Sequence, residues 1–218
     1  MRSVLFRAAS CIVFGLLLTS STGCNVIGAL TNKVGPEQKT PAAYKLPKID
    51  TLVFVESFQN PDLYNVQSQQ LMADIGAKLT DAKVAPVVST FKLDELRGRD
   101  RSAFSKMDIP AVARAVGARQ VIYVNLVRFR TDIPIAGTQY TGQGEVRVKL
   151  FDAQTGNVLW PPDSSDGRQI RYESQGEEGI DLRNPSAVQD QICRHLAARV
   201  AELFYDAVPD EPDTSGPG

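Results

Sequence analysis

Apolar positions along the chain follow two different periods, and together they predict alternating strands and helices. Short continuous apolar runs are typical of strands buried on both faces, and they occur at residues 51–55, 84–88 and 120–129. Apolar residues spaced three and four apart predict helices at residues 66–79, 109–116 and 185–204. The highly charged segment 91–101 predicts a short helix with a solvated face.

Residues at the ends of these helices agree with the predicted boundaries. Asp108 stands two places before Pro110, and Asn184 directly precedes Pro185. Both pairs suit a helix start, because Asp and Asn are good N-caps and proline is tolerated in the first turn. Gly117 suits a helix end, where glycine adopts the left-handed conformation without strain.

Strict alternation in the second half of the chain predicts antiparallel strands. Glu145, Arg147 and Lys149 alternate with apolar residues, as in a strand with one solvated face. A hairpin turn is expected at 152–156 and further strands at 157–160 and 169–174. A parallel start and an antiparallel finish predict an α/β (α+β) fold with a single mixed sheet and helices packed on its faces.

The segment 131–144, rich in Ile, Pro and Gly, predicts a loop between two strands. Ile133, Ile135 and Tyr140 in this loop are candidates for contact with a partner protein, because exposed aliphatic and aromatic side chains are common at such contacts. The alternative is that Ile133 and Ile135 extend the edge of the sheet and pack inward.

The N-terminal residues 1–23 predict a secretory signal peptide. Arg2 and Arg7 precede an apolar run at residues 8–18. This run is shorter than the roughly twenty residues that a helix needs to cross a membrane. A permanent transmembrane helix is therefore not expected here.

Cys24 follows Ser21, Thr22 and Gly23, and this sequence resembles the lipobox of bacterial lipoproteins. The resemblance implies cleavage between Gly23 and Cys24, followed by lipidation of the Cys24 thiol. Ser21 departs from the pattern, which usually has an aliphatic residue at that position. The alternative is an ordinary secretory signal followed by an incidental cysteine.

The remaining chain divides into three parts by composition. Residues 24–48 are expected to form a lipidated cysteine and a flexible tether, because Gly and Pro are spread among polar residues. Residues 49–206 form the predicted globular domain, and 207–218 are expected to be a disordered acidic tail. Asn25 follows the lipidated position and is not aspartate, which favours the outer membrane and a location facing the periplasm.

Charge and cysteine content argue against several classes of protein. Loss of residues 1–23 removes two of the 24 basic side chains, so 22 remain against 25 acidic ones, and nucleic-acid binding is not expected. Cys11 leaves with the signal and Cys24 carries lipid, so Cys193 is left as a buried structural thiol. With no CxxC pattern, neither a metal nor a cofactor is expected.

Catalytic motifs are also missing from the sequence, which has no GxSxG, P-loop, HExxH or GxGxxG pattern. The only histidine, His195, is expected at the edge of the last helix's apolar stripe. The acidic pairs at 94–95 and 177–178 are most simply solvated surface. Basic residues at 97, 99 and 101 are candidates for contact with anionic lipid or glycan, although the acids between them offset much of their charge.

Three segments resemble, in order, parts of a superfamily that includes the curli-secretion lipoprotein, the lipoprotein activators of penicillin-binding proteins and the TolB amino-terminal domain. They are LVFVESFQN at 52–60, AVGARQVIY at 115–123 and LFDAQTGNVLW at 150–160. The resemblance spans about residues 50–205 and implies a mixed α/β domain on a tether. A membrane channel needs additional transmembrane hairpins, and 131–144 is too short to supply them, so a pore is not expected.

These observations predict a non-enzymatic lipoprotein, held in the membrane of the cell envelope by Cys24, that binds or helps to assemble a periplasmic or outer-membrane protein. Two alternatives remain. One is an enzyme acting on cell wall or polysaccharide, for which Glu56, Asp62 and Glu173 would have to meet in one cleft. The other is a self-assembling ring component of a secretion system, which would make the protein a homo-oligomer.

Overall fold

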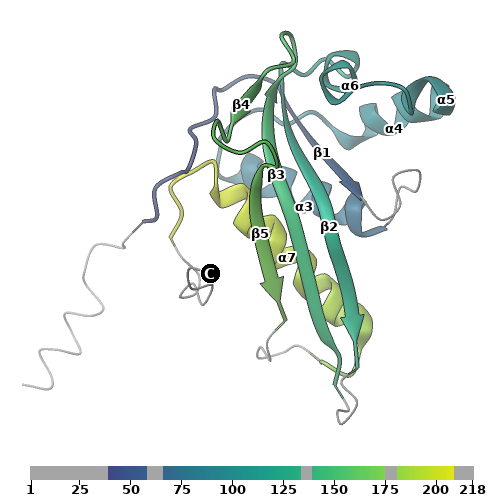
Figure 1. Ribbon diagram of the computed structural model, residues 1–218, viewed down its shortest axis with the longest axis vertical. Coiled ribbons are helices and arrows are strands. Elements are labelled where there is room, and N and C mark those ends of the chain that lie inside the picture. The colour runs from purple at the N-terminus through teal and green to yellow at the C-terminus, as the bar shows by residue number, and fades with distance from the viewer. Residues whose placement is uncertain (1–38, 58–65, 134–138, 175–180, 209–218) are drawn as a thin grey trace, which may run out of the picture. The chain divides into compact units, whose positions relative to one another are not determined.

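A computed structural model describes residues 39–57, 66–133, 139–174 and 181–208 of the chain (Figure 1). The predicted signal, the Gly23–Cys24 cleavage site and most of the predicted tether and tail lie outside these ranges. Residues 40–207 form one compact unit. In the described ranges, no helix combines the length and apolar character needed to span a bilayer.

The structure confirms a single mixed sheet with helices packed against it. Its strands are β1 (Thr51–Ser57), β2 (Gln120–Asp132), β3 (Thr141–Asp152), β4 (Val158–Trp160) and β5 (Arg168–Glu173). Strand β1 pairs with β2 in parallel, and the other pairs, β2–β3, β3–β4 and β3–β5, are antiparallel. Strands β4 and β5 follow one another along the same edge of β3. The helices are α3 (Val66–Asp81), α4 (Thr90–Arg99), α5 (Arg101–Phe104), α6 (Ile109–Ala115) and α7 (Pro185–Glu202).

Helices α3 and α7 pack side by side on one face of the sheet, and α4, α5 and α6 lie beside β1 (Figure 1). Strand β1 is buried on both faces, as its continuous apolar run predicts, with Leu52, Val53, Phe54 and Val55 all at most 5% exposed. The apolar stripes of α3 and α7 meet the sheet at Ile75, Ile192 and Leu196, whose exposed fraction is 0% in each case. The main core therefore lies between these two helices and the sheet.

The predicted starts of α6 and α7 and the predicted end of α6 agree with the structure, whereas the segment 91–101 holds α4 and the start of a second helix, α5, divided at Asp100. Asp108 Oδ1 accepts a hydrogen bond from Ala111 N (2.7 Å), and Asn184 Oδ1 accepts one from Ser186 N (3.0 Å). Both are N-cap interactions, which satisfy an otherwise unpaired donor in the first turn. Gly117, directly after the C-cap of α6, has a φ of 85°.

The strand predicted at 84–88 is wrong, because this segment makes only a single bridge. Thr51 N donates to Pro86 O (2.8 Å), and Val88 N donates to Thr51 O (2.9 Å). Pro86 has no N–H to continue a ladder, and Ser89 then caps α4 by accepting a hydrogen bond from Phe91 N (3.3 Å). The chain therefore leaves the sheet edge after one pair of hydrogen bonds.

The loop predicted at 131–144 is also too long, because both of its ends belong to strands. Strand β2 continues to Asp132 and β3 begins at Thr141. Gly142 and Gly144 face α7, and a Cβ built on them would lie 2.6 Å from Val188 Cγ1 and 2.5 Å from Ile192 Cγ2, respectively. These glycines are therefore strand residues that let a helix approach the backbone closely.

The segment after Thr40 packs on the domain, although residues up to 48 were expected to belong to the tether. Thr40 and Ala207 exchange two backbone hydrogen bonds (2.7 and 3.0 Å), and Tyr44 N donates to Leu203 O (3.0 Å). The buried Gln120 side chain donates from Nε2 to Pro47 O (3.0 Å). The compact unit therefore begins at Thr40 rather than at residue 49.

Replacement of Gly144 by alanine is expected to lower the free energy of unfolding by about 1–3 kcal/mol, because the new methyl group would overlap Ile192 and force α7 away from β3. Gly98→Ala in α4 is the matched control. It meets no atom within 4 Å, so stability should stay unchanged or rise by up to about 1 kcal/mol. Urea unfolding followed by circular dichroism measures both. Equal stability of the two variants would contradict the proposed contact.

Candidate functional site

The face of the sheet opposite α3 and α7 carries alternate polar residues of β2, β3 and β5. Gly142 and Gly144 contact α7, so the residues between and beyond them on β3 point to the other side. No helix lies in front of β3 or β5 in the described part of the chain (Figure 1). The strand register brings the following residues together on what we call the open face: Tyr123, Asn125, Arg128, Arg130 and Asp132 on β2; Gln143, Glu145, Arg147 and Lys149 on β3; Gln169, Arg171 and Glu173 on β5.

Glu145 lies at the middle of the open face and is only 7% exposed. Its Oε2 accepts a hydrogen bond from Arg171 Nε (3.3 Å), and its Oε1 accepts one from the side chain of Gln169. Arg128 lies opposite Glu145 on β2. A carboxylate that is largely removed from water needs such charge-assisted partners, so Glu145 fastens β5 to β3.

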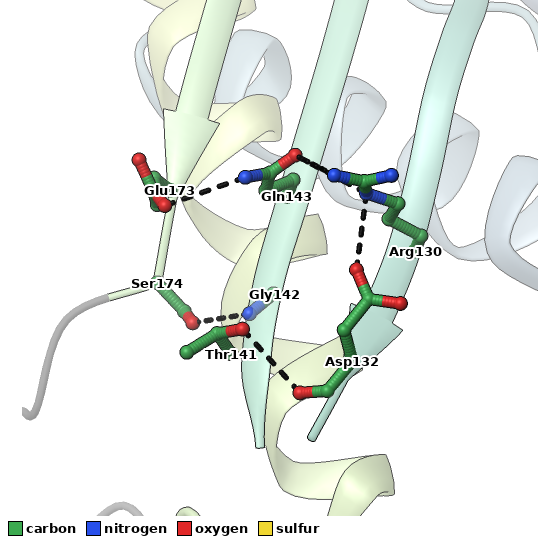
Figure 2. Close-up of polar contacts among 7 residues, drawn as sticks. All are labelled: Arg130, Asp132, Thr141, Gly142, Gln143, Glu173 and Ser174. Atoms are coloured by element: carbon green, nitrogen blue, oxygen red, sulfur yellow. Dashed lines mark hydrogen bonds and ion pairs between the residues drawn. The ribbon is translucent and has the colours of Figure 1, made fainter. Parts of the chain in front are cut away.

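A chain of side-chain contacts crosses β2, β3 and β5 near the end of the sheet that holds Asp132 and Thr141 (Figure 2). Arg130 Nη2 donates to Gln143 Oε1 (3.0 Å), and Gln143 Nε2 donates to Glu173 Oε1 (3.3 Å). Arg130 Nε also forms an ion pair with Asp132 Oδ2 (3.1 Å). The central glutamine thus acts as donor on one side and acceptor on the other, and it fixes the side chains of both neighbouring strands.

Two further hydrogen bonds fasten the strand ends in the same region (Figure 2). Thr141 Oγ1 donates to the backbone oxygen of Asp132 (3.3 Å). Gly142 N donates to Ser174 Oγ (2.6 Å). The β2–β3 hairpin and the end of β5 are therefore joined by side chains as well as by the backbone ladder.

At the other end of the open face, Tyr123 OH donates to Glu56 Oε2 on β1 (2.9 Å). Burial raises the pKa of the Tyr123 hydroxyl well above its usual value, and the negative charge of Glu56 raises it further. Tyr123 therefore stays protonated and serves as a hydrogen-bond donor. A group that holds its proton this firmly is unsuited to act as a base or nucleophile at neutral pH.

Positive and negative side chains on the open face balance in number. Arg147 Nη1 lies 3.2 Å from Asp166 Oδ2 in the segment before β5. The cations are Arg128, Arg130, Arg147, Lys149 and Arg171, and the acids on or bound to the face are Glu56, Asp132, Glu145, Asp166 and Glu173. Such a surface has no strong field of one sign, which suits a protein surface of mixed charge better than a polyanion.

The structure places Glu56 and Glu173, two of the three acids required by the enzymatic alternative, in different rows of the sheet. The row of paired residues that begins at Glu56 crosses β2 at Asn125 and reaches β5 at Gln169. Glu173 belongs to another row, where it pairs with Gln143. Asp62 lies outside the described residues. Within the described ranges, no group of three His, Cys, Asp or Glu side chains is placed to hold a metal ion.

His195 lies at the edge of the apolar stripe of α7, as predicted. Its ring stacks on the ring of Tyr172 with centroids 4.3 Å apart and planes 8° from parallel. Tyr172 is on the helix side of β5, so this contact fastens β5 to α7. The stack gives His195 a packing role.

The charged residues of α4 pair with one another. Arg99 Nη2 lies 2.6 Å from Glu95 Oε1, and Arg97 Nη1 lies 3.9 Å from Asp94 Oδ1. The guanidinium of Arg97 also lies 4.7 Å from the ring centroid of Phe104. These pairs offset the charges of Arg97 and Arg99 in the basic segment proposed for lipid or glycan contact. The acidic pair 177–178 lies outside the described residues.

The candidate contact residues of the β2–β3 connection occupy different environments. Ile133 is 55% exposed. Tyr140 is half-buried against the core, and its backbone N donates to Leu182 O (2.7 Å), so it does not project as the loop prediction implied. Ile135 lies outside the described residues. A contact role for Ile133 and Ile135 stays a prediction.

Sequence reasoning missed the open face because a bulge in β2 changes which residues face outward. Val124 and Leu126 point to the helices, but the register shifts between Leu126 and Arg128. Beyond this bulge, Arg128 and Arg130 point to the open face instead. The available signal was the change in spacing of polar residues between Asn125 and Arg128.

Cys193 is completely buried in α7. Burial raises the pKa of the Cys193 thiol to about 12, and the negative charges of Asp74 and Asp190 add to this effect. The predicted structural role agrees with these surroundings, because the thiolate is the reactive form and is strongly disfavoured here.

No protein-family model and no curated protein matches the sequence. Solved structures that are similar include the PelC dodecamer from Paraburkholderia phytofirmans, at 14% identity over 78% of this chain and 99% of that chain, with a TM-score of 0.42. Lipoprotein GNA1162 from Neisseria meningitidis has 17% identity over 70% of this chain and 98% of that chain, with a TM-score of 0.42. The LpoB C-terminal domain from Salmonella enterica has 14% identity over 69% of this chain and 93% of that chain, with a TM-score of 0.35. Bacterial lipoproteins are thus found among the similar structures.

Cys193 is expected to resist thiol reagents in the folded protein. In the chain 24–218 with Cys24→Ala, DTNB at pH 8 should detect no thiol until the protein is unfolded, when one thiol per chain should appear. An added cysteine at exposed Ser102 is the control and should react at once. Rapid reaction of Cys193 without denaturant would contradict its burial.

Proposed function

We propose that the protein is a non-catalytic accessory lipoprotein of the bacterial cell envelope that binds a protein partner through the open face. The observation that carries this proposal is a polar sheet surface whose β3 and β5 residues have no helix in front of them in the described ranges. Its alternating acids and bases offer many directional contacts. The partner would be a periplasmic or outer-membrane protein with a surface of complementary mixed charge.

The side chains of the open face are suited to binding because they are already held in place. Gln143 is fixed between Arg130 and Glu173, and Glu145 is fixed by Arg171. A side chain that is ordered before binding loses little conformational entropy when the partner arrives. The cross-strand contacts thus support recognition as well as the stability of the sheet.

The same contacts are a poor basis for catalysis. Glu145, Glu56 and Glu173 each accept a hydrogen bond from a neighbouring side chain. Acids and bases that take part in catalysis usually meet in a cleft, with pKa values shifted toward the working pH. Tyr123 shifts in the opposite direction, since its pKa rises away from neutrality.

The anchor in this proposal is Cys24, lipidated after cleavage at Gly23. A diacylglyceryl group together with an amide-linked acyl chain would hold the protein permanently, whereas one chain alone binds reversibly. Because the compact unit begins at Thr40, the tether would comprise residues 24–39. A flexible chain of this length reaches roughly 20–25 Å, so the domain would work close to the membrane.

Cys24→Ala is expected to abolish lipidation and release the protein from membranes. Cells grown with an alkyne fatty acid should label the wild type but not this variant, and mass spectrometry should show the loss of the lipid mass. Cys193→Ala is the control, because its thiol is buried in α7, and it should label as the wild type does. Unchanged membrane association of Cys24→Ala would overturn the proposed anchor.

We expect charge reversal at both Arg128 and Lys149 to weaken partner binding about tenfold or more. Each substitution replaces a positive charge on the open face by a negative one, so acidic groups of the partner would be repelled. The tagged double variant Arg128→Glu/Lys149→Glu is compared with wild type by cross-linking in envelopes and quantitative mass spectrometry.

Lys92→Glu/Lys106→Glu provides the same charge change on exposed residues away from the open face. It should capture the same envelope proteins as wild type. Thermal unfolding checks that all three proteins are folded. Equal capture by the open-face variant and this control would refute the assignment of the binding surface.

A further inference from the structure

The outer edge of β5 is an unpaired strand edge within the described part of the chain (Figure 1). Strand β5 pairs with β3 along its other edge, from Arg168 opposite Val148 to Glu173 opposite Gln143. The register is continuous and contains no bulge. Such an edge presents backbone donors and acceptors to any strand that can approach it.

The hydrogen bonds to β3 show which residues of β5 point outward. Ser174 N donates to Gly142 O (2.8 Å), so the even-numbered residues of this segment direct their backbone groups to β3. The backbone N–H and C=O groups of the odd-numbered residues therefore point away from the sheet. These residues are Gln169, Arg171 and Glu173.

Natural proteins often protect a free edge with proline, a bulge or a covering segment. The sequence RQIRYE of β5 has no proline, and its pairing has no bulge. Arg168, Arg171 and Glu173 are the charges that remain to control pairing. They exclude a register that sets like charges opposite each other and favour one that sets opposite charges together.

The occupant that these charges fit best is the β5 strand of a second copy. Antiparallel pairing of two β5 strands in one sheet places the two-fold axis through a single residue, because paired side chains must lie on the same face. An axis through Arg171 would set Arg171 opposite itself. An axis through Ile170 would set Arg171 opposite the neutral Gln169 of the second copy. An axis through Tyr172 sets Arg171 of each copy opposite Glu173 of the other, so two pairs of opposite charge form.

We propose that two copies of this chain pair their β5 edges antiparallel, about a two-fold axis at Tyr172, to form one continuous sheet. The outward-pointing backbone groups of Arg171 and Glu173 supply the hydrogen bonds, and the two Tyr172 side chains lie opposite each other on the helix side of the joined sheet. The Arg171 side chain is 70% exposed even though it contacts Glu145. Glu173 uses only Oε1 toward Gln143, which leaves Oε2 for Arg171 of the second copy.

This pairing goes beyond the proposed function, because it requires neither the lipid anchor nor the envelope partner. It would leave α3 and α7 of both copies on one side of the joined sheet and both open faces on the other. Two binding surfaces would then face the same direction. An envelope partner with repeated sites would be held more tightly by such a pair than by one copy.

A charge-exchange experiment tests the pairing. In the chain 24–218 with Cys24→Ala, the wild type should show a concentration-dependent dimer by analytical ultracentrifugation. Glu173→Arg and Arg171→Glu should each weaken that dimer, because each makes both cross-strand pairs like-charged. A mixture of the two variants should form a heterodimer, because the opposite charges are restored at both pairs.

The control is Asp81→Arg, an equivalent charge reversal at the exposed end of α3, and it should dimerise as the wild type does. A monomeric wild type would overturn the proposal. Failure of the mixture to recover the dimer would overturn the assigned contacts.

Single cysteines test the register independently. Ile170→Cys, Arg171→Cys and Tyr172→Cys are made in a chain that also carries Cys24→Ala and Cys193→Ala. Oxidation should link copies fastest at position 172, because residues that oppose themselves across the axis bring their Cβ atoms within disulfide distance. Fastest linking at 170 or 171, or linking at no position, would show that the proposed axis is wrong.

Discussion

Close contact between α7 and the backbone of β3 is the constraint on which the rest of the structure depends. Gly142 and Gly144 have no side chain, so Val188, Ile192 and Leu196 can pack directly against the strand. This contact commits one face of the sheet to the helices. The polar residues between the glycines must then face the other side, and this produces the open face. The same helix position also brings His195 onto Tyr172 and holds β5 in place.

Much of the fold follows from local sequence, because its helices and strands obey simple periods. Asp108, Asn184 and Gly117 mark helix ends by chemistry that depends only on neighbouring residues. The continuous apolar run of β1 and the alternation around Arg147 likewise have local causes. The features that could not be predicted depend on contacts between distant segments. Gly142 and Gly144 resemble loop residues until α7 is present, and the segment after Thr40 resembles a tether until Ala207 lies beside it.

Residue type alone predicts only part of the open face. Alternation at residues 145–149 identified one solvated strand, but the partners of Glu145 come from β5 and its neighbour Arg128 comes from β2. The bulge after Leu126 determines that Arg128 faces outward, and its sign in the local sequence is the changed spacing of polar residues between Asn125 and Arg128. The strand register, which is a property of the folded sheet, turns scattered charges into one connected surface.

The bridge between Thr40 and Ala207 also determines where the N-terminal segment joins the domain. The aromatic rings of Phe204 and Trp160 pack 6.0 Å apart between their centroids, and Trp160 pairs with Leu150 near one end of β3. The N-terminal segment therefore joins the domain at that end, whereas the β2–β3 hairpin lies at the other end. The eight residue steps from Gly142 to Leu150 span about 27 Å of strand. Under the proposed anchor at Cys24, the domain would pivot about this end, and the β2–β3 hairpin at the other end would move through the greatest distance.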